Sequence, residues 1–520
     1  MLETLDRRGP LTSRIMSHSK MFSFLFSSQY SRGMGVLYIC NIMLGSGVLT
    51  LPKLFAETGW LLGLVGLSVV AIASYCTGTF VVETLFIHRL LQRHQQDDNQ
   101  KRAGKDENVM DNEGSCNKIT SCHPTDPNNV NIIENFHIEQ PNNQQEEVTK
   151  EEYKKDAPMK KNEERGGGAQ FGHLCQMFFP NFLYILFYVT LCLQCYGVIS
   201  IDFVILSKSL TSITCDESDW ETVNATTTCM TMEHLTVHQV YLVMLSIIVA
   251  LIGPFVFFTI STTKIIQLLA FIYRFLSFAC MTVIGMTKVG NGTKLTPKLA
   301  VFSKLPNFVG AVLYILGFHV SLPAIIHPIA YKQRLKPVII IPFVIVLALD
   351  VLLVMSACYS YPVEEIQDIY TLNFTHPPPL KYLLQLFPVI CLSSSAPITG
   401  IVLRENLKKL ILKKNEGEYS FVVRRIAFPL LVLIPPVSVA YVTDDVGMLV
   451  GYIGTCTGGI LLYVFPALLV YYARRTAMRT LGNHYSVDNE SPFSHNAWVV
   501  LILVWYLIST SMMVYYRVTS

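Results

Sequence analysis

The chain has 520 residues, of which 51% are hydrophobic and 15% charged, and its formal net charge is +3. Soluble domains carry about 25% charged residues, so this composition indicates a membrane protein. The small net charge gives no reason to expect a nucleic-acid partner. The sequence contains no nucleotide-binding loop, paired catalytic carboxylates or nucleophile elbow, so we expect neither an enzyme nor an ATP-driven pump.

About eleven apolar segments are long enough to cross a bilayer as helices, which takes about 20 residues each. We therefore predict an all-α polytopic membrane protein with residues 1–32 as a cytoplasmic tail, spans one and two in 33–88, and the other spans in 169–520. In chain order, the predicted spans lie at about 33–56, 60–88, 182–210, 240–259, 264–286, 308–331, 338–360, 382–403, 426–442, 447–472 and 497–516.

A hydrophilic block separates the second span from the third. Residues 89–168 are rich in Asn, Gln, Glu, Lys and Asp and poor in aromatic residues, so they cannot bury enough apolar surface to fold alone. We predict a disordered cytoplasmic loop, with residues 131–138 as an amphipathic piece.

The distribution of Lys and Arg near the span ends predicts the orientation. Basic residues cluster before the first span and after the sixth, eighth and tenth, which places the N-terminus in the cytoplasm and the C-terminus in the extracellular space or a lumen. A lysine group between residues 288 and 304 argues against this orientation. The sequence does not choose between the plasma membrane and an endolysosomal membrane.

Three glycosylation sequons fall on the predicted outer side, at Asn224, Asn291 and Asn373. A fourth, at Asn489, falls on the cytoplasmic side and is expected to stay unmodified. Cys215 and Cys229 bracket an outer polar loop. Because that compartment is oxidising, we predict a disulfide between them.

Residues that disfavour a regular helix interrupt the first span. Asn41 is followed by Gly45, Ser46 and Gly47, and then by Pro52. Unwound backbone is tolerated at membrane depth only where it is buried in protein or lines a cavity, and secondary transporters bind substrate at such breaks. Freed N–H groups suit a carboxylate, and freed carbonyls suit a cation. We predict substrate contacts at Asn41, Gly45, Ser46 and Gly47; close helix packing through small residues is the alternative.

The sixth span repeats the pattern. Residues 317–323 read Gly-Phe-His-Val-Ser-Leu-Pro and end in the same Leu-Pro pair as the first break. A five-plus-five inverted repeat places its two broken helices five spans apart, as here. Phe318 and His319 lie beside this break, so we expect them to contact substrate. A packing role is the alternative for His319.

The eighth span carries hydroxyl side chains that suit a hard cation. Ser395 and Thr399, together with Asn41, form a candidate Na⁺ site because hard cations take oxygen ligands. The alternative is that these hydroxyls bond back to their own helix.

Ionisable residues inside spans are functional candidates by default. Arg274 lies in the middle of a span and needs a partner, which either Asp202 or Asp350 would supply. A structural ion pair and a proton relay both fit this pattern. Glu83 lies near the cytoplasmic end of its span.

These motifs resemble the amino acid/auxin permease superfamily, which includes the sodium-coupled neutral amino acid transporters. The resemblance rests on the stretch from Asn41 to Pro52 with 56–60, on 317–323, and on 451–458 with Pro466 and Ala467. The resemblance covers most of the chain except 89–168. It is strongest to an orphan branch of the superfamily, and it does not indicate which substrate that branch carries. It implies the five-plus-five fold, amino-acid transport, substrate contacts at 45–47, and a position at Asn41 linked to cation coupling.

The residues and the resemblance together predict a secondary active transporter that moves amino acids by alternating access, in symport with Na⁺ or H⁺ and with no other cofactor. Its expected partners are a small-molecule substrate and the lipid bilayer. The alternative is a membrane amino-acid sensor with little transport, which would bind a cytoplasmic protein through residues 89–168. A channel is a third option.

Overall fold

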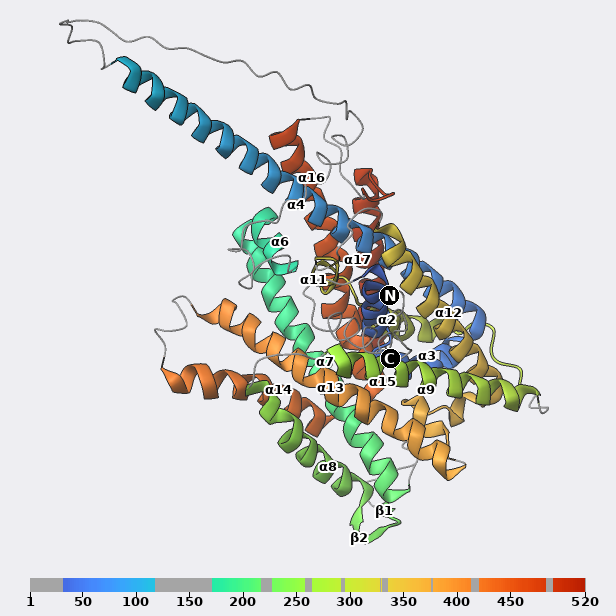
Figure 1. The fold of residues 1–520 in the computed structure, drawn as a ribbon. Coiled ribbons are helices and arrows are strands. Elements are labelled where there is room, and N and C mark those ends of the chain that lie inside the picture. The colour runs from blue at the N-terminus through green and yellow to red at the C-terminus, as the bar shows by residue number, and fades with distance from the viewer. Residues whose placement is uncertain are drawn as a thin grey trace, which may run out of the picture. The chain divides into compact units, whose positions relative to one another are not determined.

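The computed structural model describes residues 31–116, 171–216, 227–257, 264–290, 295–327, 329, 335–375, 377–412, 420–482 and 490–519. By its internal contacts the chain divides into two units, one made of Met1–His88 with Ala169–Ser520 and the other of Arg89–Gly168. Helices dominate the described residues, and a single short hairpin interrupts them (Figure 1).

The all-α polytopic fold predicted from sequence is confirmed. Eight helices among the described residues are long and apolar enough to cross a membrane, and α14 (Phe428–Val442) is a shorter apolar helix. Two interrupted spans complete the predicted eleven. The first consists of α2 (Arg32–Met43), η1 (Ser46–Leu49) and α3 (Leu51–Thr58), and the sixth of α10 (Leu305–Ile315) and α11 (Leu322–Ile326).

Except for α6, which lies outside every predicted span, the remaining helices follow the predicted spans and extend beyond most of their ends. They are α4 (Trp60–Cys116), α6 (Phe171–Phe178), α7 (Asn181–Cys215), α8 (Val237–Ile252) with η2 (Gly253–Phe257), α9 (Lys264–Gly290), α12 (Lys336–Ser360), α13 (Pro378–Ile411), α15 (Val446–Ile453), α16 (Phe465–Leu481) and α17 (Asn496–Thr519). Short 3₁₀ turns lie at η3 (Phe302–Lys304), η4 (Val363–Glu365) and η5 (Tyr370–Asn373), and π turns at η7 (Val423–Ala427), η8 (Gly454–Gly458) and η9 (Ile460–Val464).

Helix α4 corrects one prediction. The sequence predicted that the second span ends at His88 and that a disordered loop follows, but the helix continues to Cys116. A hydrophilic segment cannot bury a core, yet a helix that is already nucleated in the membrane extends at little cost through Gln, Arg, Lys and Glu. His94 and Asp98 form an i,i+4 pair at 3.2 Å on this extension. The rest of the loop, including 131–138, lies outside the described residues.

Helix α7 lies at the centre of the membrane-spanning unit. Its most apolar stretch is 72% buried, and that of the span running from Val446 to Leu481 is 67% buried, against 22% for α17. The outward face of α17 exposes large apolar side chains at Val500, Leu501, Val504, Leu507 and Ile508. Such a face suits lipid, so α17 is peripheral while α7 and the α15–α16 span form the core.

The loop after α7 is closed as predicted by a disulfide between Cys215 and Cys229. Cys229 belongs to β1 (Thr228–Cys229), which pairs antiparallel with β2 (Met232–Thr236) and lies against the start of α8 (Figure 1). Thr236 caps α8 through a capping box with Gln239, so the hairpin leads directly into the helix.

The C-terminal end of α3 is tied to the segment that precedes α10. Trp60 N–H donates to the Lys298 carbonyl at 3.1 Å, and Val301 N–H donates to the Thr58 carbonyl at 2.8 Å. Between them Gly59 has φ +93°, and a Cβ there would lie 2.8 Å from backbone atoms of the neighbouring segment. Only glycine fits both the conformation and the space.

Candidate functional site

The break in the first span lies at Leu44 and Gly45, between α2 and η1. Pro52 stands in the first turn of α3, where its missing N–H costs nothing, so the helix restarts there. The Ser46 hydroxyl lies 3.2 Å from the Tyr314 hydroxyl of α10. A Cβ on Gly47 would lie 2.5 Å from Tyr314 Cδ1 and 2.9 Å from a side-chain carbon of Ile315. The first break therefore packs directly against the sixth span.

Gly45 differs from Gly47 in its surroundings. A Cβ on Gly45 would meet only the Ile42 carbonyl oxygen, at 3.5 Å, which is an ordinary contact. The small size of Gly47 is thus required by packing. That of Gly45 is not, although its extended conformation, with φ −79° and ψ −165°, carries the chain from α2 into η1.

The sixth span is interrupted at residues 316–321, and hydroxyl side chains of α4 cover the break. Ser74 Oγ donates to the Leu316 carbonyl at 3.1 Å, which satisfies a carbonyl left free where α10 ends. Pro323 stands in the first turn of α11. Phe318 is fully buried, and a Cβ added to Gly78 of α4 would lie 2.8 Å from its ring.

His319 is fully buried in the same break. Its Nε2 lies 2.9 Å from the Ser74 carbonyl oxygen and 2.9 Å from Thr77 Oγ1. A carbonyl only accepts, so the hydrogen-bond network assigns the proton to Nε2. Among the described residues Nδ1 has no hydrogen-bond partner. His319 is therefore held on one side by α4 and keeps one ring nitrogen unused.

Two of the buried ionisable groups meet at the first break. The Arg274 guanidinium of α9, 5% exposed, donates through Nη1 to the backbone carbonyl of Asn41, one of the last residues of α2. It also contacts the Cys391 thiol of α13. Asp202 of α7, 2% exposed, interacts electrostatically with Arg274 and hydrogen-bonds to Ser46.

Asp350 of α12 stands apart from this group. It is 1% exposed, and neither carboxylate oxygen has a hydrogen-bond partner among the described residues. Of the two carboxylates that the sequence offered to Arg274, Asp202 is the one that interacts with it electrostatically.

The eighth-span hydroxyls have turned to their own helix. Ser395 Oγ donates to the Leu392 carbonyl at 3.2 Å, and Thr399 Oγ1 donates to the Ser395 carbonyl at 3.2 Å. Cys391, one turn before Ser395, is the α13 side chain that reaches Arg274. The predicted Na⁺ site remains a prediction, and the carbonyl of Asn41 is engaged by a guanidinium.

Of the three sequons that are predicted to lie outside, the structure describes one. Asn224 and Asn291 lie outside the described residues. Asn373 closes η5, where its Nδ2 donates to the Glu365 carbonyl at 2.6 Å and its Oδ1 accepts from Gln367 N–H at 3.0 Å. Its glycosylation remains a prediction.

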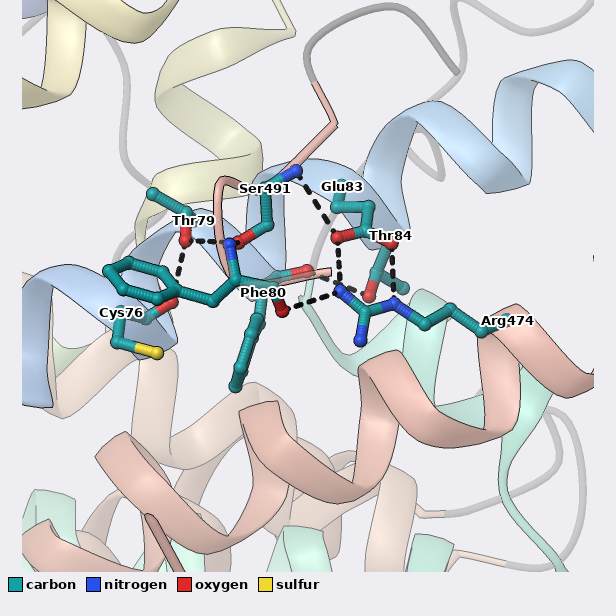
Figure 2. Close-up of polar contacts among 8 residues, drawn as sticks. Cys76, Thr79, Phe80, Glu83, Thr84, Arg474 and Ser491 are labelled. Carbon is teal, nitrogen blue, oxygen red and sulfur yellow. Dashed lines mark hydrogen bonds and ion pairs between the residues drawn. The ribbon is translucent and has the colours of Figure 1, made fainter. Parts of the chain in front are cut away.

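A buried ion pair lies toward the predicted cytoplasmic side, and Figure 2 shows it. Glu83 of α4 accepts two hydrogen bonds from Arg474 of α16, each 2.7 Å long. Ser491 N–H donates to the same carboxylate at 3.3 Å, and Arg474 donates to the Phe493 carbonyl at 3.2 Å. Ser491 Oγ lies 2.8 Å from Thr79 Oγ1 (Figure 2). This network fastens the segment before α17 to α4.

Sequence reasoning missed Tyr314, Ser74 and Thr77, which complete the two breaks. The three-residue spacing of Ser74 and Thr77 places both on one face of α4, and this spacing is the only sequence signal for them. Tyr314 gave no signal, because an aromatic residue before a break is ordinary in an apolar span.

Comparison with known proteins agrees with this architecture. Residues 28–102 and 157–514 match the family of transmembrane amino acid transporter proteins. Transmembrane protein 104 of Homo sapiens is 32% identical over 500 residues, covering 92% of this chain and 94% of its own length. Its homologs in Drosophila melanogaster and Dictyostelium discoideum are 29% and 28% identical, each over 92% of this chain and 95% of their own length. The chain belongs to the transmembrane amino acid transporter protein family.

Proposed function

We propose that this protein is a secondary active transporter of amino acids and binds its substrate where the first and sixth spans are broken. The observation that carries the proposal is the contact between the two breaks, made by Ser46 and Gly47 against Tyr314 of α10. Broken helices that meet at membrane depth are the means by which transporters expose backbone groups to substrate. Membership of an amino acid transporter family supports the same substrate class.

The two breaks offer complementary groups to an amino acid. The unwound backbone at 45–47 presents N–H groups to the substrate carboxylate. The unused Nδ1 of His319 accepts a hydrogen bond, which suits the substrate ammonium. Ser46 and Asn41 supply further polar contacts, and Phe318 closes the site on the side of α4. The coupling ion in this proposal is either Na⁺ or H⁺.

Substrate cannot reach the site without helix movement, because Phe318 and His319 have no exposed surface. The described state therefore corresponds to a closed conformation in an alternating-access cycle. Rocking of one helix bundle against another would open it to each side in turn.

The experiment is uptake of a tritiated mixture of the 20 common amino acids into proteoliposomes. Gly47→Ala should reduce uptake by about tenfold or more, equivalent to a loss of about 1.4 kcal/mol or more, because the new methyl group displaces Tyr314. Gly33→Ala, on the same span, meets nothing closer than 3.7 Å and serves as the matched control. If a folded Gly47→Ala protein takes up amino acids at the wild-type rate, the substrate site does not lie at the breaks.

A membrane amino-acid sensor is the second candidate function. Its support is the size of the second unit, Arg89–Gly168, which is more than a carrier needs to join two spans. Replacing this unit with a short Gly/Ser linker separates the two functions. If flux survives and capture of a cytoplasmic partner is lost, the unit serves signalling; if neither changes, the sensor function has no support.

We further infer an N-terminus in the cytoplasm and a C-terminus outside, with glycans at Asn224, Asn291 and Asn373. Removal of N-linked glycans should increase the gel mobility of the wild-type protein, and each Asn→Gln substitution should remove one step of that shift. A glycan at Asn489 would reverse the inferred orientation. Fluorescent fusions at either terminus would show which membrane holds the protein.

A further inference from the structure

We propose that transport is coupled to H⁺ and not to Na⁺, with Arg274 as a fixed cation at the first break and Asp202 as the group that takes up the proton. This inference rests on the proposed transport function and names the ion that drives it. Its basis is the position of two buried side chains from α9 and α7, together with the way in which the carboxylate is satisfied.

Arg274 already stands where a cation would bind. The last carbonyls of a helix have no partner within it, and Asn41 belongs to the last turn of α2. The Arg274 guanidinium donates to that carbonyl. Since a guanidinium keeps its charge, the Asn41 carbonyl accepts a hydrogen bond from a cation that is part of the protein and never dissociates. The hydroxyls of Ser395 and Thr399 donate their hydrogens to carbonyls of α13, their own helix.

Asp202 is a carboxylate with an unfilled acceptor. Its Oδ1 has no hydrogen-bond partner among the described residues, while Ser46 hydrogen-bonds to the carboxylate and Arg274 acts on it through charge. A comparison within the protein is the Glu83–Arg474 pair, in which two bonds of 2.7 Å occupy both oxygens. A pair in which both carboxylate oxygens are hydrogen-bonded in this way has a structural role. An incompletely satisfied carboxylate beside a fixed cation has room for a proton.

Few other titratable groups face Asp202. Arg274 comes from α9 and Tyr314 from α10, and Cys391 of α13 contacts the guanidinium. The buried residues of α14 and α15 are apolar, and α8 carries His238 and Tyr241, of which Tyr241 donates to the Ala440 carbonyl at 2.7 Å. The other elements packed against α7 carry His173 and Cys175 on α6, Cys456 on η8 and Tyr463 on η9. Protonation of Asp202 would therefore change the balance of one pair, Asp202 with Arg274.

The cycle balances with one proton per substrate. When the carboxylate takes a proton from the outer side it becomes neutral, and the Arg274 charge is left for the carboxylate of the incoming amino acid. When substrate leaves on the inner side, the proton leaves with it and Asp202 again neutralises Arg274. The link from Asp202 through Ser46 to Tyr314 places this event at the contact between the two broken spans.

The test uses proteoliposomes with K⁺ and valinomycin on both sides, no Na⁺, and the same tritiated mixture of 20 amino acids. An inward gradient of about two pH units should drive up to about 100-fold accumulation at one proton per substrate, since one pH unit equals about 1.36 kcal/mol. An internal pH-sensitive dye should report acidification when the mixture is added. Asp202→Asn should abolish both signals, and Asp350→Asn, which alters the other unpaired buried carboxylate, should keep them.

Counterflow separates this inference from the transport function. Exchange of labelled for unlabelled amino acids needs no ion gradient, so its presence in the wild type tests transport alone. If exchange occurs but only a Na⁺ gradient drives accumulation, the inference is overturned and the transporter function stands. Loss of accumulation in Asp350→Asn with retention in folded Asp202→Asn would also overturn it. Absence of exchange for every amino acid contradicts the transport function itself.

Discussion

The buried pair of Glu83 and Arg474 gives the sharpest stability prediction. Both side chains are at most 6% exposed. Glu83→Gln removes the negative charge and leaves the guanidinium buried without compensation. Breaking a buried pair in this way costs about 3–5 kcal/mol, so we expect this loss in the free energy of unfolding. Arg474→Gln should cost the same, because it leaves a buried carboxylate.

The double variant Glu83→Leu/Arg474→Met should cost much less than the sum of the two single variants. It leaves no buried charge, and apolar side chains of similar volume replace ion pairs at little cost. What remains is the loss of partners for Ser491 N–H and the Phe493 carbonyl, about 1–3 kcal/mol each. The expected total of about 2–6 kcal/mol lies below the 6–10 kcal/mol, roughly, that additive single losses would give.

The free energy of unfolding can be measured by titrating SDS into dodecyl maltoside micelles and following tryptophan fluorescence. The exposed pair His94 and Asp98 is the control, with 43% and 49% of the two side chains accessible. Asp98→Asn should change stability by less than about 0.5 kcal/mol. Single variants of Glu83 or Arg474 that cost under about 1 kcal/mol, or an additive double variant, would refute the reasoning about buried charge.

Three further predictions test packing, covalent closure and titration. Gly454→Ala should destabilise the protein by about 1–3 kcal/mol in the same titration, because its methyl group would overlap the Gly310 carbonyl oxygen of α10. Cys215→Ser should cost about 3 kcal/mol, since the disulfide to Cys229 spans 14 residues, and reduction of the wild type should reproduce this loss. Burial raises the pKa of Tyr361 to about 12. The contribution of its neutral side chain to the free energy of unfolding is therefore complete below pH 10 and is lost as the pH rises toward 12. Tyr361→Phe should flatten this part of the curve of stability against pH.

The sequence predicted the fold and the two breaks because these depend on local composition. Gly45, Gly47 and Gly317, with Pro52 and Pro323, mark interruptions in otherwise apolar spans, and the chain is broken where they occur. The extension of α4 was not predictable from burial, because a solvated helix that continues from a membrane span does not need to bury a core.

The partners of the polar residues were not predictable in the same way. Glu83 and Arg474 are 391 positions apart, and nothing local distinguishes their pairing from a pairing of Asp202 with Arg474. The sequence placed His319 correctly beside the second break. It could not predict the contacts of this side chain with α4, because these depend on how two helices cross. The bonds of Ser395 and Thr399 were easier to anticipate, because a serine or threonine in a helix can donate to a carbonyl of its own helix whatever the tertiary structure.

The hydrogen bonds between the C-terminal end of α3 and residues 298–301 have a consequence for sequence variation. Connecting segments normally accept insertions and substitutions, because their backbone groups are free to turn to water. Residues 298–301 cannot, since their amides and carbonyls are bonded to Thr58 and Trp60. Their backbone also packs directly against Gly59, where a side chain has no room. A stretch that is a loop by position should therefore be as constrained in length and sequence as the helices that it joins, and a tag or epitope placed there would separate α3 from α10.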